Sequence, residues 1–358
     1  MAIKLDNIHF SLNHILGYNL PFNFIISERE AGKSTAVWLY VYSKWKKDNS
    51  TCLVIRRKVV HITQAYIEDI AKIINKFTDD RVVFQYAKGS LKEGIIDVSI
   101  EGKPFIRIIG LSIDITAGKS LVLRDLGTIV FDEFICNARF WEKYLKEEAI
   151  KFMEIYNTFR RESTNLKCLF LGNPYSLYNP YFVYFNVQTR LLKRGAVISD
   201  KKSYVIQCYE ITEELKAKIL KENPLYQFDN AYTKYAFNGI NVNDENILIN
   251  ENIPSNFYLM FVFRIEGKYI AVYRNRDYTN FEYQFHACFI SPEKVSKKRD
   301  IYVFDFSDLV DRTMLLSNED RIYFSRLKNA VRRRSIAFNS IECYYLFEEI
   351  FYNLWNLH

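Results

Sequence analysis

The sequence predicts an α/β fold built on a largely parallel sheet, followed by a smaller α+β domain. Three observations support this prediction. Short apolar runs alternate with helical patterns through residues 22–209. These runs show no polar alternation, which is typical of strands buried on both faces of a sheet. After residue 209 the chain becomes polar, and aromatic-rich strands followed by helices are expected from residue 257 onward.

Apolar and β-branched runs mark the expected strands of the first domain. They lie at residues 22–26, 51–55, 81–84, 94–100, 105–109, 128–131, 167–171 and 205–209. Apolar side chains recur at helical spacing in residues 34–47, 64–77 and 142–160, which are expected to be helices. Glu101 and Gly102 form a turn signal that predicts a hairpin between two of the strands.

The 358 residues are enough for two domains of about 150 residues each. We expect an α/β domain at 1–209, a helical connector at 210–250 and a second domain at 251–358. The second domain should contain strands at 257–263, 269–273, 283–289 and 301–304, and helices at 321–331 and 342–354.

The composition indicates a globular protein, with 49% hydrophobic and 25% charged residues, and it excludes a disordered chain. The net charge of +7 is compatible with a polyanionic partner. The six cysteines form no C-x-x-C pair, so we expect buried thiols and no zinc site. Because no apolar run reaches the roughly 18 residues of a membrane span, and no signal peptide is evident, a cytoplasmic location is expected.

The segment from Ser27 to Ser34 has the spacing of a phosphate-binding loop, with Ser27 in place of the first glycine. It follows an expected strand and opens an expected helix. Backbone N–H groups would cradle the phosphates of ATP, Lys33 would reach the β- and γ-phosphates, and the Ser34 hydroxyl would bind Mg²⁺. The candidate nucleotide-binding residues are Ser27, Glu28, Arg29, Glu30, Ala31, Gly32, Lys33, Ser34 and Thr35. The alternative is a surface turn that contains Gly-Lys-Ser by chance.

A second Ala-Gly-Lys-Ser occurs at residues 117–120. It has Ile113 where the first glycine would stand, and no long amphipathic helix follows it at once. We therefore expect this segment to be an ordinary loop.

Two carboxylates, Asp132 and Glu133, follow the expected strand at 128–131. They would lie at the carboxyl edge of the sheet, where ligands bind in α/β proteins. Asp132 is predicted to hold Mg²⁺ through water, and Glu133 to orient and polarise the attacking water. An adjacent pair favours the ASCE class of P-loop ATPases, in which the catalytic glutamate follows the Mg²⁺-binding aspartate. An apolar strand with a polar end is the simpler alternative.

Two further polar sites are weaker. Asn173 follows the strand at 167–171 and suits a γ-phosphate sensor, although Gly-Asn-Pro is also a turn signal. Arg160 and Arg161 end the helix at 142–160, where the helix dipole favours cations. The functional alternative is an arginine finger that serves the nucleotide of a neighbouring subunit.

Together these segments resemble the large-terminase group of phage DNA-packaging ATPases, and most closely the packaging motors of phi29-like podophages. The resemblance covers residues 22–187, with matching stretches at 27–34, 54–57, 128–135, 168–173 and 179–186. It implies an ASCE/terminase-type P-loop domain that uses ATP and Mg²⁺ to move double-stranded DNA into a viral prohead.

The resemblance also implies roles for single residues. Lys33 and Ser34 match the P-loop lysine and the Mg²⁺ ligand, and Arg29 matches a characteristic P-loop arginine. Asp132 and Glu133 match the Walker B pair.

By the same resemblance, Asn173 matches the coupling motif, Arg160 the trans-acting arginine finger, and Lys119 a second basic residue donated in trans. The sequence departs from the family at Ser27 and at Glu30, where a small residue is usual. One extra residue between Arg160 and Cys168 leaves Arg161 as an alternative finger.

The second domain is expected, by resemblance, to be a vestigial RNase H-like nuclease that docks on nucleic acid. A live nuclease needs three or four carboxylates on neighbouring elements, and the strand at 257–263 has none. Asp305, Asp308 and Asp311 lie together, but a solvated loop explains them equally well. Positive charges suited either to phosphates or to a solvated helix face are Arg321, Arg326, Lys328, Arg332, Arg333 and Arg334.

The implied assembly is a homo-oligomeric ring, a pentamer by resemblance, that acts on double-stranded DNA without a membrane. It would work in the host cytoplasm, transiently at the portal vertex of the prohead, with packaging RNA as a further candidate partner. Two rivals stay open. One is a terminase large subunit with an active metal-dependent nuclease, and the other is a non-hydrolysing nucleic-acid-binding scaffold with a decayed P-loop.

Overall fold

The computed structural model describes residues 9–87, 94–113, 125–137, 144–161, 163, 165–176, 179–187, 189–223, 228, 248–265, 267–277, 283–295, 299–303, 306–316, 324–333 and 335–347. The chain divides into two compact units, Met1–Asn243 and Asp244–His358. The boundary falls within the segment expected to be a connector, of which α7 (Glu213–Glu222) is described. Within the described ranges, no helix is both long enough and apolar enough to cross a membrane.

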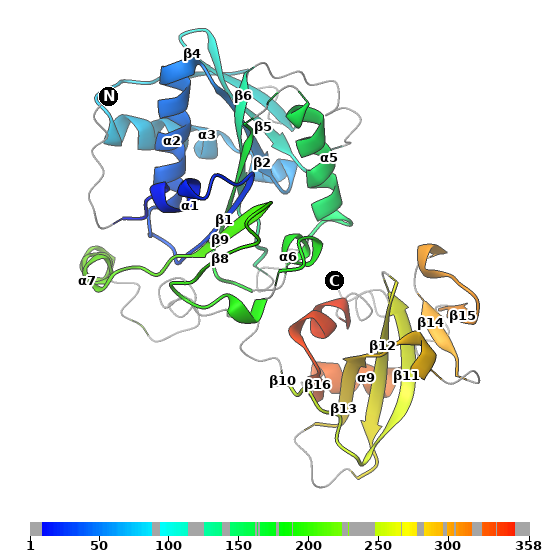
Figure 1. Cartoon of the computed structure of the whole chain (residues 1–358). Coiled ribbons are helices and arrows are strands. Elements are labelled where there is room, and N and C mark those ends of the chain that lie inside the picture. Colours follow the sequence, from blue (N-terminus) through cyan, green and yellow to red (C-terminus); the bar gives the residue numbers. More distant parts are fainter. Residues whose placement is uncertain are drawn as a thin grey trace. The chain divides into compact units, whose positions relative to one another are not determined.

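A nine-stranded sheet forms the centre of the first unit, in the order β3-β4-β5-β2-β6-β7-β1-β9-β8 (Figure 1). Its strands are β1 (Phe22–Ile26), β2 (Thr51–Arg56), β3 (Phe84–Gln85), β4 (Ile95–Ile100), β5 (Lys103–Gly110), β6 (Leu126–Asp132), β7 (Lys167–Gly172), β8 (Val197–Ser199) and β9 (Tyr204–Cys208). The neighbours from β5 to β9 all pair in parallel, and β3, β4 and β8 add antiparallel edges. The predicted α/β fold with a largely parallel sheet is confirmed, as is the β4–β5 hairpin.

Helices cover both faces of this sheet (Figure 1). The α2 (Lys33–Asp48) and α3 (Gln64–Phe77) helices pack on one face, and α5 (Glu148–Arg160), α6 (Pro180–Tyr184) and α7 pack on the other. Shorter elements are α1 (Asn13–Gly17), η1 (Val59–His61) and η4 (Thr189–Leu191). All six cysteines are free and buried, as the sequence predicts.

Two predicted elements are shorter in the structure. The strand expected at 81–84 is reduced to β3, because the Asn75 side chain binds both the N–H and the C=O of Val82 and satisfies them outside the sheet. The helix expected at 142–160 begins only at Glu148, since Glu147 has a left-handed backbone with φ of 54°. The β8 strand was not expected.

The second unit has its own seven-stranded sheet, in the order β10-β16-β13-β12-β11-β14-β15. Its strands are β10 (Leu248–Ile249), β11 (Phe257–Ile265), β12 (Lys268–Asn275), β13 (Phe285–Phe289), β14 (Ile301–Val303), β15 (Thr313–Leu315) and β16 (Ile336–Phe338). The other elements are η6 (Pro292–Lys294), η7 (Phe306–Asp308), α9 (Ser325–Arg332) and a helical segment at 341–347. Phe261, Phe263, Phe324 and Leu327 form the centre of its core. An α+β second unit is therefore confirmed.

The core between the first sheet and α5 is aromatic, and Phe170 lies at its centre. Its ring stacks on Phe24 with centroids 4.3 Å apart and lies 4.7 Å from Phe152 and 5.3 Å from Tyr181. Phe170→Ala should therefore destabilise the first unit by about 3–5 kcal/mol, measured as the free energy of unfolding in denaturant. Phe228→Ala, at a side chain that is 64% exposed, should change it by less than about 0.5 kcal/mol. Equal effects of the two variants would contradict this account of the core.

Candidate functional site

Four parallel strands bring predicted site residues, together with Arg56, to one edge of the sheet. Arg56 was not among the predicted site residues. The loop that begins at Ser27 leaves β1, Arg56 ends β2, Asp132 ends β6 and Asn173 follows β7. Because β7 lies between β1 and β6, Asn173 emerges between the predicted phosphate loop and the carboxylates. The structure thus brings together residues that are far apart in the chain.

The predicted phosphate loop has left-handed backbone at Glu30 (φ 60°) and Gly32 (φ 89°), but not at Ser27. A serine therefore fits the first position of the loop without backbone strain, although the motif has glycine there. At Gly32 a Cβ atom would lie 3.1 Å from the Cβ of His9, so glycine also suits the close approach there.

The α2 helix begins directly after this loop with an N-terminus suited to an anion. Its N-cap, Gly32, supplies no side-chain hydrogen bond, and the first turn contains no acidic residue. The N–H groups of a first helical turn have no partner within the helix and carry the positive end of its dipole. Ser34 and Thr35 are half-buried in the same turn. These donors fit the phosphates of a nucleotide.

Lys33 is buried and its amine lies inside the site. Nζ donates hydrogen bonds to Ser27 O (3.2 Å), Glu28 O (3.1 Å) and Asn173 Oδ1 (2.7 Å). Burial lowers the pKa of Lys33 to about 8, against the opposing attraction of Asp132 and Glu28. The contact with Asn173 confirms that the end of β7 reaches the predicted phosphate loop.

The two carboxylates share one cation. Arg56 contacts Asp132 Oδ2 at 2.9 Å through Nη1 and Glu133 Oε2 at 2.6 Å through Nη2. Tyr66 OH donates to Asp132 Oδ2 (3.2 Å), and the Arg56 guanidinium lies over the Tyr66 ring. Burial raises the pKa of Asp132, and Arg56 opposes that shift. Asp132 and the Ser34 hydroxyl are oxygen ligands of the kind that Mg²⁺ prefers, although within the described ranges no three acids or histidines cluster as a metal site.

Tyr175 links two of the predicted residues and was missed in the sequence. Its hydroxyl accepts hydrogen bonds from Arg29 Nη2 (3.0 Å) and from Asn173 Nδ2 (3.2 Å). The ring is buried two residues after Asn173. An unremarkable tyrosine after a Gly-Asn-Pro turn gave no signal, because its role depends on contact with a loop 146 residues away.

Glu28 has a structural partner that the sequence also did not reveal. Its carboxylate is almost fully buried and accepts a hydrogen bond from Arg194 at 2.9 Å, and Arg194 in turn reaches Glu210 at 3.3 Å. This contact ties the predicted phosphate loop to the segment before β8. The Glu28 side chain therefore helps to hold the loop in place.

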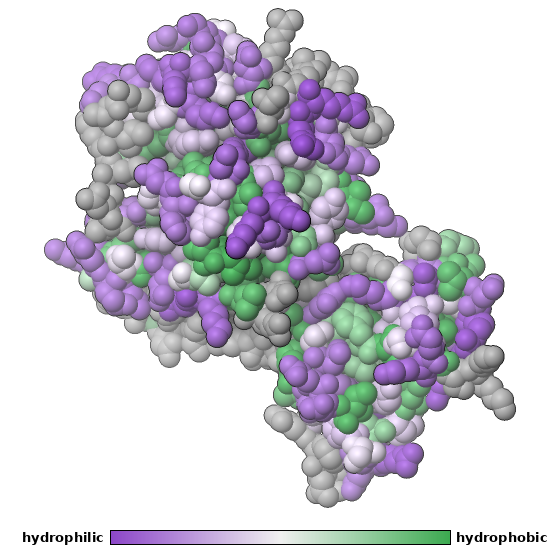
Figure 2. Space-filling view, in the orientation of Figure 1, coloured by the Kyte–Doolittle hydropathy of each residue, from purple (hydrophilic) through white to green (hydrophobic). Residues whose placement is uncertain are grey.

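Arg160 and Arg161 lie at the other edge of the sheet. Since β6 and β7 are parallel, α5 between them must run back, and its 13 residues span about 20 Å. The start of β7 confirms the direction, because Cys168 N donates to Pro21 O just before β1. Hydrophilic side chains gather over this end of α5 (Figure 2).

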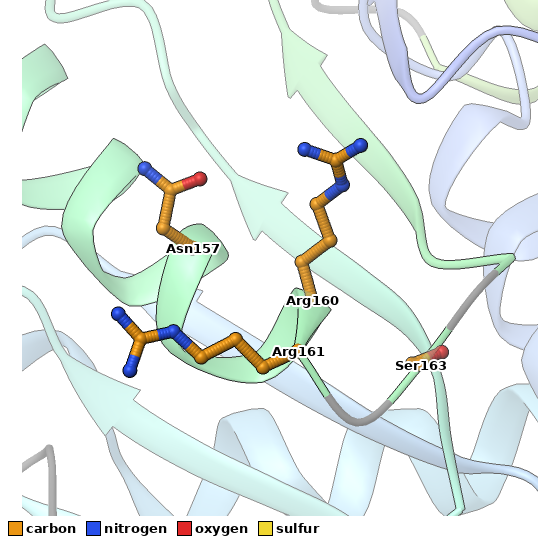
Figure 3. A pocket seen from close by; sticks show the side chains of 4 residues that line it. All are labelled: Asn157, Arg160, Arg161 and Ser163. Atoms are coloured by element: carbon orange, nitrogen blue, oxygen red, sulfur yellow. The ribbon is translucent and has the colours of Figure 1, made fainter.

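A surface pocket of about 610 Å³ lies at the end of α5 and is lined by Asn157, Arg160, Arg161 and Ser163. Figure 3 shows the two guanidinium groups leaving the helix end in different directions. Both arginines are exposed. Lys119, the other residue expected to act in trans, lies outside the described residues, as does the second Ala-Gly-Lys-Ser.

Known proteins are similar to this chain in sequence and in fold. The family model of the podovirus DNA encapsidation protein (Gp16) matches residues 5–355. The DNA packaging protein of Bacillus phage phi29 is 29% identical over 194 residues, which cover 54% of this chain but only 55% of that relative. The DNA packaging protein of Bacillus phage B103 is 24% identical over 315 residues, covering 87% of this chain and 90% of the relative.

A solved structure shows the same fold. The chain aligns with one in the bacteriophage Phi-29 viral genome packaging motor assembly with a TM-score of 0.65 and 21% identity. The alignment covers 97% of this chain and 100% of that one. At this identity the likeness establishes a shared architecture.

The burial of Lys33 predicts an unusual titration. Its amine should lose its proton with a midpoint near pH 8, because the buried site disfavours the charge, whereas lysine ordinarily titrates near 10.4. Side-chain NMR of labelled lysine, with Lys33→Arg to assign the signal, measures this. The exposed Lys72 beside Asp69 is the internal reference, and its pKa should lie above the ordinary value. A Lys33 midpoint at or above that of Lys72 would contradict the prediction.

Proposed function

The chain belongs to the family of podovirus DNA encapsidation proteins, and on that premise we propose that it is an ATP-hydrolysing motor that translocates double-stranded viral DNA into a prohead. One observation carries the proposal. The Lys33 amine, the Asn173 amide and the Asp132–Glu133 pair converge at the carboxyl edge of one parallel sheet. That arrangement combines a phosphate-binding cation, a metal-binding carboxylate and a second carboxylate for water.

Each residue has a defined part in this proposal. The first turn of α2 and the Lys33 amine bind the phosphates of ATP, and Ser34 and Asp132 hold Mg²⁺, which neutralises charge on the phosphates when bound. Glu133 orients and polarises the attacking water. Asn173 contacts Lys33 and, through Tyr175, Arg29. A change at the phosphates can therefore reach β7 through direct hydrogen bonds.

The arginine finger is proposed to act in trans. Arg160 ends a helix that runs from the carboxyl edge to the amino edge of the sheet, so about 20 Å of helix separates it from the end that carries the phosphate loop. A second subunit must bring its own Arg160 or Arg161 to that loop. This need supports a homo-oligomeric ring, and a pentamer is the proposed size. Lys119 is proposed as a second trans residue.

The motor is proposed to act at the portal vertex of the prohead in the host cytoplasm, with packaging RNA as a further partner. Contacts to phosphates rather than to bases would let it accept any DNA sequence. In the second unit, Arg326 and Arg333 of the α9 region are exposed, while Leu327 and Ala330 pack into the core. The exposed cations of α9 are the proposed contact with nucleic acid.

The second unit is proposed to be a vestigial RNase H-like nuclease without activity. Its first long strand, β11, contains no acid. Asp308, one of the three late aspartates, is engaged by Arg264 at 2.9 Å and by the Gly267 N–H at 2.9 Å. An aspartate held by a guanidinium is poorly placed to bind a metal. Asp305 lies outside the described residues. Metal-dependent cleavage of plasmid DNA by the purified protein would favour the alternative, a terminase with an active nuclease.

ATP hydrolysis is the first test. Lys33→Ala or Asp132→Ala should abolish turnover, because each removes a charge from the phosphate and metal site. Glu133→Gln should bind ATP normally and hydrolyse it about 10²–10⁴-fold more slowly, since the amide keeps the shape but cannot polarise water. Turnover and ATP affinity are measured separately, with Glu154→Gln on the exposed side of α5 as the control. A Glu133→Gln protein that still turns over would assign the base to another residue. A folded wild-type protein without ATPase activity would favour the non-hydrolysing scaffold.

Mixing two inactive variants tests the trans finger. Arg160→Ala keeps an intact Glu133, and Glu133→Gln keeps an intact Arg160. In a mixed ring, some interfaces join a subunit with an intact Glu133 to a neighbour with an intact Arg160. ATPase activity should therefore partly return if Arg160 acts in trans. The finger is typically worth about 10³–10⁵ in rate, so the recovery is easily measured. No recovery, with co-assembly confirmed, would assign Arg160 a role in its own subunit.

A further inference from the structure

A buried ion pair lies directly behind Glu133 and has no part in the function proposed above. Arg57 and Glu148 are 3% and 1% exposed, and they meet through two hydrogen bonds, from Nε to Oε2 at 2.8 Å and from Nη2 to Oε1 at 3.1 Å. The guanidinium also lies over the rings of Phe131 and Tyr144. Burying two charges is costly, and such a pair adds little stability over apolar residues of the same size. Its geometry therefore needs another explanation.

Arg57 holds the main chain of the catalytic segment. Its Nη1 donates to Glu133 O (3.0 Å) and its Nη2 donates to Phe134 O (2.6 Å). Glu133 has a left-handed backbone with φ of 60°, a conformation that non-glycine residues adopt only when their surroundings enforce it. The neighbouring Phe134 N–H is fixed to Leu171 O of β7. The fork of Arg57 thus supports the strained residue that carries the carboxylate.

Glu148 fixes the other end of the same connection. It is the first residue of α5, and its carboxylate also accepts hydrogen bonds from Leu145 N (2.8 Å) and Tyr181 OH (3.0 Å). These four bonds determine where α5 begins and in which direction it leaves the sheet. The last residue of this helix is Arg160. One rigid helix therefore joins the support of Glu133 to the finger.

We propose that Arg57 and Glu148 are positioning residues that set two groups at once, the Glu133 carboxylate in their own subunit and the α5 helix that presents Arg160 to the next. The inference rests on the proposed function and adds the link between the two active groups. A planar guanidinium suits this role because its fixed fork can bind two carbonyls and a carboxylate together, which a lysine amine cannot do.

The first test concerns Glu133. Arg57→Lys keeps the charge and loses the fork, and Glu148→Gln keeps the shape and loses the charge. Each should lower kcat by at least about tenfold, and toward 10²-fold, with the KM and Kd for ATP within about twofold of wild type. Arg57→Lys should slow Glu133→Gln by a smaller factor than it slows the wild type, because the part of its effect that acts through Glu133 is already lost. The matched control is Arg107→Lys, in a pair with Asp97 on the β4–β5 hairpin, which should leave kcat unchanged.

The second test isolates the helix. In the mixing experiment, Glu133→Gln subunits supply Arg160 to Arg160→Ala subunits. A Glu133→Gln subunit that also carries Glu148→Gln has the same inactive site, so the two donors differ only at Glu148. This double variant should restore several-fold less ATPase activity than Glu133→Gln alone at equal co-assembly. A donor that combines Glu133→Gln with Arg107→Lys should restore as much as the single variant. Equal recovery with the Glu148→Gln donor would overturn the link to Arg160.

The outcomes separate this inference from the proposed function. If Glu133→Gln abolishes hydrolysis but folded Arg57→Lys and Glu148→Gln keep the wild-type kcat, the inference fails and the function stands. If the wild-type protein hydrolyses no ATP, the proposed function fails. If Glu133→Gln keeps the wild-type rate, the role of Glu133 fails, and the inference fails with it. Should both pair variants unfold, Tyr181→Phe removes one hydrogen bond to Glu148 and keeps the pair. It should lower kcat a few-fold at unchanged KM, and an unchanged kcat would overturn the inference.

Discussion

Parallel pairing of the central strands is the constraint on which the rest of the first unit depends. Strands that run in one direction send every loop from their carboxyl ends to one edge, and every returning helix to the other. The phosphate loop, Arg56, the Asp132–Glu133 pair and Asn173 are therefore neighbours in space. The same constraint carries Arg160 away from them along α5. The assembly of the candidate site and the separation of the proposed finger from it have one cause.

Charged side chains at that edge are paired with groups in direct contact. Arg56 contacts both carboxylates, while Lys33 bonds to main-chain oxygens and to the Asn173 amide. Burial raises the pKa of Asp132 and lowers that of Lys33, so each charge there depends on its partner. A polyanion bound at Lys33 would compete for its amine with Ser27 O, Glu28 O and Asn173 Oδ1. Binding a ligand at Lys33 would therefore act on the hydrogen bond that joins α2 to the segment after β7.

The sequence predicted the parallel sheet and most of the site because both leave local signals. Buried strands are apolar runs, and the loop at Ser27–Ser34 and the Asp132–Glu133 pair follow such runs directly. Tyr175 and Glu148 left no such signal, and Arg57 follows the strand expected at 51–55 but had no predicted role. The roles of all three arise from contacts between distant segments, since Arg57 and Glu148, for example, are 91 residues apart. The start of α5 at Glu148 also depends on a contact between distant segments, because the Glu148 carboxylate binds Arg57. The shortened β3 depends on Asn75, whose side chain replaces a neighbouring strand.

The polarity of α5 also bears on why such a chain would work as an assembly. The α5 helix starts near Glu133 and ends at the opposite edge of the sheet. Its terminal arginines, Arg160 and Arg161, are therefore on the surface, where a neighbouring molecule can reach them. In the proposed ring, the neighbour would be an identical chain, and these arginines would face its carboxyl edge. Each subunit would then carry on α5 both the support of its own Glu133 and the proposed finger that serves the next subunit.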